Sequence, residues 1–77
     1  MQFDRISVNP AILGGKPCVK GTRLSVQFLL ELIASGATQS QIIEGYPQLH
    51  PDDVQQAIRF AAESLDHESV LEIEIQR

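Results

Sequence analysis

Cysteine and long apolar runs are scarce in this sequence, and each shortage excludes a class of protein. Cys18 is the one cysteine, so no disulfide can form within the chain. No apolar run approaches the roughly 20 residues that span a bilayer, and no basic-then-apolar leader follows Met1. We therefore expect a protein of the reducing cytoplasm that has no membrane-spanning helix.

Charged and chain-breaking residues are too few for a disordered chain, because 21% of residues are charged and four are proline. The chain is expected to fold as a single domain over residues 1–77. A domain of this size buries only about 60% of the surface that its unfolded chain exposes. Its core is therefore small, and a partner surface would add to its stability.

Positive charge is concentrated in the first thirty residues. The net charge of −4 is the sum of two unlike parts. Residues 31–77 sum to −7, with nine acids and two arginines, whereas residues 1–30 sum to +3, with Asp4 against Arg5, Lys16, Lys20 and Arg23. Lys and Arg supply most non-specific nucleic-acid affinity by neutralising phosphate. Any DNA contact is therefore expected in the first third of the chain, or in a dimer that brings two such thirds together.

The first 24 residues indicate a β-arm followed by a glycine-rich basic loop. Residues 5–8 alternate polar and apolar side chains, and the turn dipeptide Asn9-Pro10 ends this predicted strand. Glycine and proline pairs interrupt residues 11–23 on both sides of a short extended piece at residues 18–20. This piece can pair with the first strand as a hairpin-like arm.

Capping residues and apolar spacing predict two helices next in the chain. Ser25 is a good N-cap, and apolar residues follow it at i, i+3, i+4 and i+7 until Gly36 ends the helix. Thr38 and Gln41 have the spacing of a capping box and begin a second, short helix. That helix must end before Pro47, because proline disfavours the helical conformation in the residue that precedes it.

The third predicted helix has the most regular pattern in the sequence. Pro51 suits a first helical position, and Asp52 and Asp53 complement the positive end of the helix dipole. The polar residues, including both aspartates, are expected on the solvent side, and Phe60 lies at the margin as a candidate partner contact. The apolar residues recur at helical spacing and form a stripe expected to face the core: Val54, Ala57, Ile58, Ala61, Ala62 and Leu65.

Residues 67–77 form a tail with a different period. Leu71, Ile73 and Ile75 alternate with glutamates, which fits a one-sided strand better than a continued helix. Two roles are open for this strand. It can add to the edge of a partner's sheet, or it can pair with residues 5–8 in the same chain or across a dimer. In both cases we predict that the three apolar residues are partner or dimer contacts.

Three helices joined by short turns predict a mainly α fold. We expect a helix-turn-helix bundle over residues 25–66, preceded by the β-arm and basic loop of residues 1–24. In DNA-binding proteins of this architecture the third helix enters the major groove. Here the solvent side of that helix offers Arg59 and two glutamines but also four acids, so it is a poor candidate for base recognition.

The glycines and cations of the basic loop have two interpretations. Gly14-Gly15-Lys16 and residues 20–23 resemble a phosphate cradle, because glycine lets backbone N–H groups approach an anion. The spacing of a P-loop is absent, so a turn with a solvated basic surface explains the same residues. If the protein contacts nucleic acid, the contacts are predicted to be Lys16, Lys20, Arg23 and Arg59.

No pattern indicates an enzyme, a metal site or a cofactor. The sequence brings together no nucleophile, base and orienting group, and no pair of carboxylates in a shared cleft. His50 with Asp52 and Asp53 has no third ligand at a suitable spacing, so helix capping explains these acids better than metal binding. Cys18 has no paired histidine and is interpreted as a small core filler. We therefore expect a module that acts by binding.

Six strings of residues carry a resemblance to a known family. They are Asn9-Pro10-Ala11-Ile12-Leu13-Gly14-Gly15-Lys16-Pro17, Lys20-Gly21-Thr22-Arg23-Leu24-Ser25-Val26, Ala34-Ser35-Gly36, Tyr46-Pro47-Gln48-Leu49, Asp52-Asp53-Val54 and Ala57-Ile58-Arg59-Phe60-Ala61-Ala62. Their order and spacing resemble domain-of-unknown-function family 433 over about residues 5–64. The resemblance implies a homeodomain-like trihelical fold with an N-terminal β-arm, and no catalytic residues are carried over from it.

The resemblance also implies an antitoxin-like role beside a PIN-like ribonuclease toxin encoded nearby. Our leading hypothesis is a homodimeric antitoxin of a toxin–antitoxin system, which neutralises the toxin by direct contact and has operator DNA binding through the basic arm as an additional role. The alternative is a stand-alone helix-turn-helix DNA-binding transcription regulator, which the clustered Lys16, Lys20 and Arg23 favour. A structural dimer subunit of a larger complex is a third hypothesis.

Overall fold

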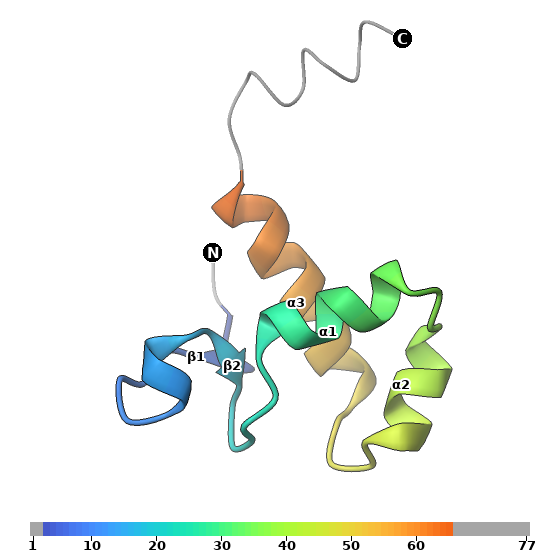
Figure 1. Ribbon diagram of the computed structural model, residues 1–77, viewed down its shortest axis with the longest axis horizontal. Helices are drawn as coiled ribbons and strands as arrows, with labels where there is room; N and C mark the ends of the chain where they lie inside the picture. The colour runs from blue at the N-terminus through green and yellow to red at the C-terminus, as the bar shows by residue number, and fades with distance from the viewer. Residues whose placement is uncertain (1–2, 66–77) are drawn as a thin grey trace, which may run out of the picture.

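The computed structural model describes residues 3–65, which form three helices and a short β-hairpin (Figure 1). Helices α1 and α3 pack against each other, and α2 lies at the end of the body opposite the hairpin. The predicted mainly α, three-helix fold with a short N-terminal β-arm is confirmed. In chain order the elements are β1 (Ile6–Ser7), the 3-10 helix η1 (Leu13–Gly15), β2 (Cys18–Val19), α1 (Val26–Ala34), α2 (Gln39–Gly45) and α3 (Pro51–Ser64).

The β-arm is an antiparallel pair of two-residue strands. Ile6 of β1 lies opposite Val19 of β2, which confirms the strand predicted within residues 5–8 and its pairing with the extended piece. The arm is joined to the start of α1, because the Val26 N–H donates to the Pro17 carbonyl oxygen at 2.8 Å. The arm is therefore continuous with the helical body.

Side-chain caps begin α1 and α2 where the sequence predicts them. The Ser25 Oγ accepts the Phe28 N–H at 2.9 Å at the start of α1. At the start of α2 the Thr38 Oγ1 accepts the Gln41 N–H at 3.1 Å, and the Gln41 Oε1 accepts the Thr38 N–H at 2.8 Å. These bonds satisfy N–H groups that the first helical turn leaves unpaired, so both boundaries are set locally.

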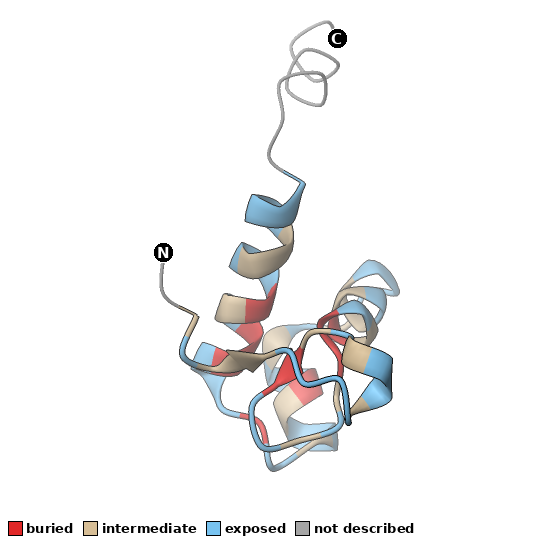
Figure 2. Cartoon of the chain, turned by 90° about the vertical axis from the view of Figure 1, so that its left-hand side faces the viewer, coloured by how far each residue is buried: buried red, intermediate tan, exposed pale blue. Residues whose placement is uncertain are grey.

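One small core lies between the arm and the three helices, and Figure 2 shows the buried residues gathered where these elements meet. Cys18 is buried beside Val19, in agreement with its interpretation as a core filler. Each of the helices and β2 contributes to this core, so no element is stable without its neighbours. Its buried members are Val19, Val26, Leu29, Ile42, Leu49, Val54 and Ala57.

The face that α3 buries is rotated from the predicted stripe. Val54 and Ala57 are buried as expected, but Ile58 is 39% exposed and Leu65 is 64% exposed. Ala62 is exposed as well. The prediction that the whole apolar stripe faces the core is therefore wrong for these three residues.

Asp53 and Phe60 lie on the buried side of α3 instead. Asp53 is completely buried, which corrects its predicted place on the solvent side. Phe60 is half-buried and packs edge-to-face on Phe3, with ring centroids 5.3 Å apart. The cause is the arm, since β1 contacts the side of α3 on which Asp53, Ala57 and Phe60 recur at i, i+4 and i+7.

The tail predicted over residues 67–77 lies outside the described residues. The contacts predicted for Leu71, Ile73 and Ile75 therefore stay predictions. Within residues 3–65, no helix is long and apolar enough to cross a membrane.

Gly36 ends α1 in a conformation that other residues avoid, with a φ of +102°. A Cβ atom at this position would meet no atom within 4 Å, so a side chain there is opposed by backbone conformation and not by collision. We expect Gly36→Ala to lower the free energy of unfolding by about 1–2 kcal/mol, measured by urea unfolding.

Gly45 is the matched control, because it also has open space around it but no positive φ. Gly45→Ala at the end of α2 is expected to be neutral or to stabilise by up to about 1 kcal/mol. If both variants lose the same free energy of unfolding, the loss in Gly36→Ala is not caused by the positive φ of that residue.

Candidate interaction surfaces

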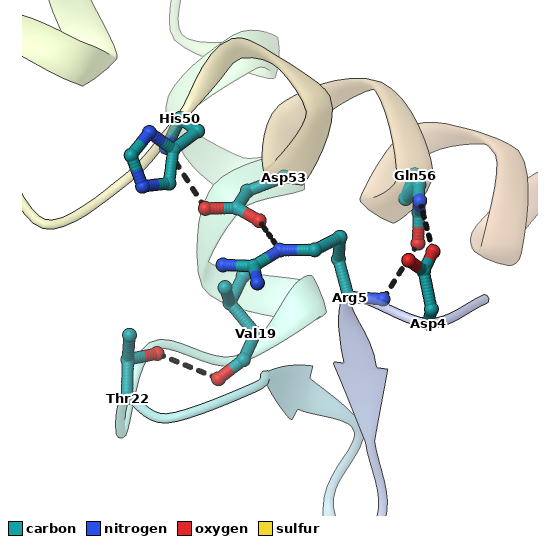
Figure 3. Close-up of polar contacts among 7 residues, drawn as sticks. All are labelled: Asp4, Arg5, Val19, Thr22, His50, Asp53 and Gln56. Atoms are coloured by element: carbon teal, nitrogen blue, oxygen red, sulfur yellow. Dashed lines mark hydrogen bonds and ion pairs between the residues drawn. The ribbon is translucent and has the colours of Figure 1, made fainter.

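An ion pair between the partly exposed Arg5 and the buried Asp53 fixes the arm to α3. Arg5, just before β1, donates from Nε to the Asp53 Oδ1 at 2.5 Å (Figure 3). The other carboxylate oxygen of Asp53 accepts the His50 backbone N–H at 2.8 Å. Both oxygens of this fully buried carboxylate are thus hydrogen-bonded, as a buried charge requires. Among the residues that the structure describes, this is the one ion pair.

Gln56 makes a second attachment between the arm and α3, about one turn beyond Asp53. Its Oε1 accepts the Arg5 backbone N–H at 2.9 Å, and its Nε2 donates to the Asp4 Oδ1 at 2.8 Å (Figure 3). The sequence pattern does not predict these contacts, because Arg5 and Asp53 are 48 positions apart. The sequence gives one indication of these contacts: helical spacing places Asp53 on the same side of α3 as Ala57 and Phe60.

The surroundings of Asp53 act on its pKa in opposite directions. Burial raises the pKa of the carboxyl group, because the charged form loses hydration. The hydrogen bonds from Arg5 and His50 and the positive charge of Arg5 lower it, and the net result is a pKa below its ordinary value. The hydrogen bond to Asp53 likewise raises the pKa of Arg5. Both groups are therefore charged near neutral pH.

The acids at the start of α3 do not converge on a metal-binding position. Asp52 is exposed, whereas both oxygens of Asp53 are engaged in hydrogen bonds. Within residues 3–65, no three His, Cys, Asp or Glu side chains gather closely enough to hold a metal ion. Helix capping, the predicted role of Asp53, is confirmed by its bond to the His50 N–H.

The basic segment, defined as residues 16–23, carries three of the predicted nucleic-acid contacts: Lys16, Lys20 and Arg23. All three side chains are exposed. The turn after β2 is held by Thr22, whose hydroxyl donates to the Val19 carbonyl oxygen at 2.9 Å (Figure 3). This bond fixes the backbone between Lys20 and Arg23, so the two cations flank a defined turn at which an anion can bind.

Arg59, the fourth predicted nucleic-acid contact, lies on another part of the surface. It is exposed in the second half of α3, outside the basic segment. The structure therefore divides the predicted set, since three cations share one segment and Arg59 belongs to a different surface.

The surface around Arg59 combines apolar and charged side chains along α3. We define the α3 outer face as Gln55, Ile58, Arg59, Ala62, Glu63 and Leu65. All but Leu65 line a shallow hollow of about 360 Å³, and Leu65 follows the last residue of the helix. Neighbouring exposed apolar side chains are typical of protein contact surfaces, and Glu63 would repel a DNA phosphate.

The predicted partner contacts have different outcomes. Phe60 is half-buried against Phe3, so much of its ring takes part in the contact between arm and helix. Ile58 and Leu65 are surface candidates that the sequence pattern places in the core. One feature of the sequence indicates this exposure. The apolar stripe of α3 is wider than the neighbouring elements of so small a domain can cover.

Comparison with known proteins places this bundle in a family. The family model described as "Protein of unknown function (DUF433)" matches residues 6–61. The chain therefore belongs to the DUF433 family, which confirms the resemblance found in the sequence.

Two relatives extend this comparison. The uncharacterised protein y4eO of Sinorhizobium fredii (strain NBRC 101917 / NGR234) is 32% identical over 56 residues, which are 73% of this chain and 25% of that protein. The chain thus spans about a quarter of the length of this relative. The crystal structure of a DUF433 member from Anabaena variabilis ATCC 29413 superimposes with a TM-score of 0.74, at 24% identity, over 96% of this chain and 70% of the other. That likeness shows the fold.

The Arg5–Asp53 pair predicts an acid-sensitive part of the stability. Because the folded-state pKa of Asp53 is lowered, the pair stabilises the protein above the unfolded-state value of about 3.9, and this contribution is lost as the pH falls through the folded-state pKa. We expect Asp53→Asn to lower the free energy of unfolding at neutral pH by about 1–3 kcal/mol. The variant should also lose less stability than the wild type as the pH falls below about 5.

Asp52→Asn is the control, because it removes a charge from the same helix end at an exposed site. Its effect should be at most about 0.5–1 kcal/mol. Urea unfolding at a series of pH values measures both variants. If the free energy of unfolding falls by the same amount with pH in Asp53→Asn and in the wild type, the Arg5–Asp53 pair does not contribute as described.

Proposed function

We propose that this protein is a homodimeric, antitoxin-like regulator of the cytoplasm that binds and neutralises a PIN-like ribonuclease toxin. The observation that carries the proposal is the separation of charge along the chain. The exposed cations of the basic segment precede α1, whereas most of the acids follow it and are densest in residues 66–77. The family resemblance implies the toxin partner.

An acidic surface suits contact with a ribonuclease. An enzyme that binds RNA presents cations to the phosphate backbone, and acids on a partner compete for the same cations. Residues 66–77 supply the densest acidic stretch: Asp66, Glu68, Glu72 and Glu74. The same stretch carries Leu71, Ile73 and Ile75 at alternate positions, a pattern suited to adding a strand to another sheet. We therefore assign the toxin contact to residues 66–77.

Co-expression with the product of the adjacent reading frame tests this function. We expect the neighbour to be a PIN-like toxin whose inhibition of growth is relieved by this protein. Changing the four acids of residues 66–77 to their amides should weaken binding by about 30-fold at low salt, measured by calorimetry.

The matched control is the double variant Glu31→Gln, Glu44→Gln, which removes exposed acids from α1 and α2. It should leave the affinity within about threefold of the wild type. The function is refuted if a toxin-like neighbour is present but is neither bound nor neutralised.

A second function, a stand-alone DNA-binding regulator, is favoured by the turn of the basic segment. Its exposed cations flank a backbone that Thr22 holds in place. Contacts of this kind bind phosphates and position a protein on DNA without distinguishing sequences. The α3 outer face supports this function less, because Glu63 lies beside Arg59 there.

Binding to the DNA upstream of its own reading frame tests the second function. The triple variant Lys16→Ala, Lys20→Ala, Arg23→Ala should reduce the slope of log K against log salt by about 2–3. Arg59→Ala is the control and should change the slope by less than about 1, because Arg59 lies on another surface. Wild-type affinity that does not depend on salt, or no binding at low salt, would rule the second function out.

A further inference from the structure

We infer that the α3 outer face is a two-fold interface, on which a second copy of this chain binds with its own α3 antiparallel. The inference rests on the proposed function only for the existence of a homodimer. It assigns the surface that makes the dimer and the relative direction of the two helices.

The α3 outer face has an apolar border and a charged border. At 3.6 residues per turn, Ile58, Ala62 and Leu65 fall toward one side of the face, and Arg59 and Glu63 fall toward the other. Ile58 is 39% exposed and Leu65 is 64% exposed, so the remainder of residues 3–65 leaves the apolar border uncovered. Ala62 lies between them, and its small side chain lets a second helix approach closely.

Two-fold symmetry matches these borders when the helices are antiparallel. The symmetry axis then runs perpendicular to both helices, and each border stays on its own side of the contact. Ile58 of one copy lies against Ala62 and Leu65 of the other, so the apolar borders cover each other. A parallel pair would instead place each apolar border against a charged one, which leaves charges desolvated without partners.

The charged border is complementary to its own copy in the antiparallel arrangement. Arg59 and Glu63 have opposite charges and lie four positions apart, so each Arg59 can meet the Glu63 of the second copy in two identical ion pairs. With the other described residues, neither side chain makes an ion pair. Within one helix, a pair four positions apart is less stable when the cation precedes the acid than in the reverse order. An ion pair between Arg59 and Glu63 of the same helix is therefore disfavoured.

The described residues leave room for this contact. In both views, the second half of α3 projects beyond α1, α2 and the hairpin (Figures 1 and 2). Within residues 3–65, a second α3 can therefore lie along it without a collision between the two helical bodies. The contact is short, so we expect a dissociation constant of about 1–10 µM.

Sedimentation equilibrium of the full chain tests the apolar border. The wild type should be a dimer in this concentration range, and Ile58→Glu should raise the dissociation constant by about 100-fold. Val8→Glu is the matched control, because Val8 is also apolar and is 59% exposed, but lies on the arm. It should leave the dissociation constant within about threefold of the wild type.

A charge exchange tests the antiparallel direction. Arg59→Glu and Glu63→Arg should each raise the dissociation constant by about tenfold, because each places like charges together in both symmetric pairs. The double variant Arg59→Glu, Glu63→Arg restores opposite charges and should return to within about threefold of the wild type. These residues are exposed, so the variants are expected to fold, and urea unfolding checks that they do.

The outcomes separate this inference from the proposed function. A monomeric wild type at about 100 µM would overturn it, as would a dimer that Ile58→Glu leaves intact or a double charge variant as weak as the single ones. A dimer with the expected pattern that does not bind the toxin would support the interface and refute the antitoxin role. A monomer that neutralises the toxin would do the reverse.

Discussion

A carboxylate without access to water must be paired, and in this protein that requirement decides how α3 lies. The buried Asp53 receives one hydrogen bond from Arg5 of the arm and another from the backbone of His50. A rotation of α3 that buried the entire apolar stripe would carry the carboxylate away from Arg5. The helix therefore lies with Asp53, Ala57 and Phe60 on its inner side, where Phe3 and β1 cover them.

The same orientation creates the surface on the opposite side of α3. One regular apolar stripe is divided by the arm, so that Val54 and Ala57 belong to the core while Ile58 and Leu65 are exposed. The contact between Arg5 and Asp53 thus has two results: it attaches the arm to α3, and it leaves the α3 outer face exposed. A small domain has little apolar surface to spare, and Ile58 and Leu65 are left outside its core.

Charge is distributed over separate parts of the protein. The cations of the basic segment are held on a turn that Thr22 fixes, and the acids follow on the helices and in residues 66–77. The α3 outer face is electrically balanced by Arg59 and Glu63. We propose phosphate as the ligand of the basic segment, a cationic enzyme as the partner of residues 66–77, and a second copy of the chain as the partner of the α3 outer face.

The sequence by itself determined the elements and their ends. The cap at Thr38 and the end of α1 at Gly36 depend on residues within three or four positions, so these helix boundaries could be predicted. The exposure of the lysines and arginines of the basic segment could also be predicted, because these residue types are rarely buried. Only the tertiary structure decided that Asp53 is buried and Ile58 is exposed. Both depend on a contact with Arg5, 48 positions from Asp53, and the spacing of residues along one helix does not record which distant side chain will pack against it.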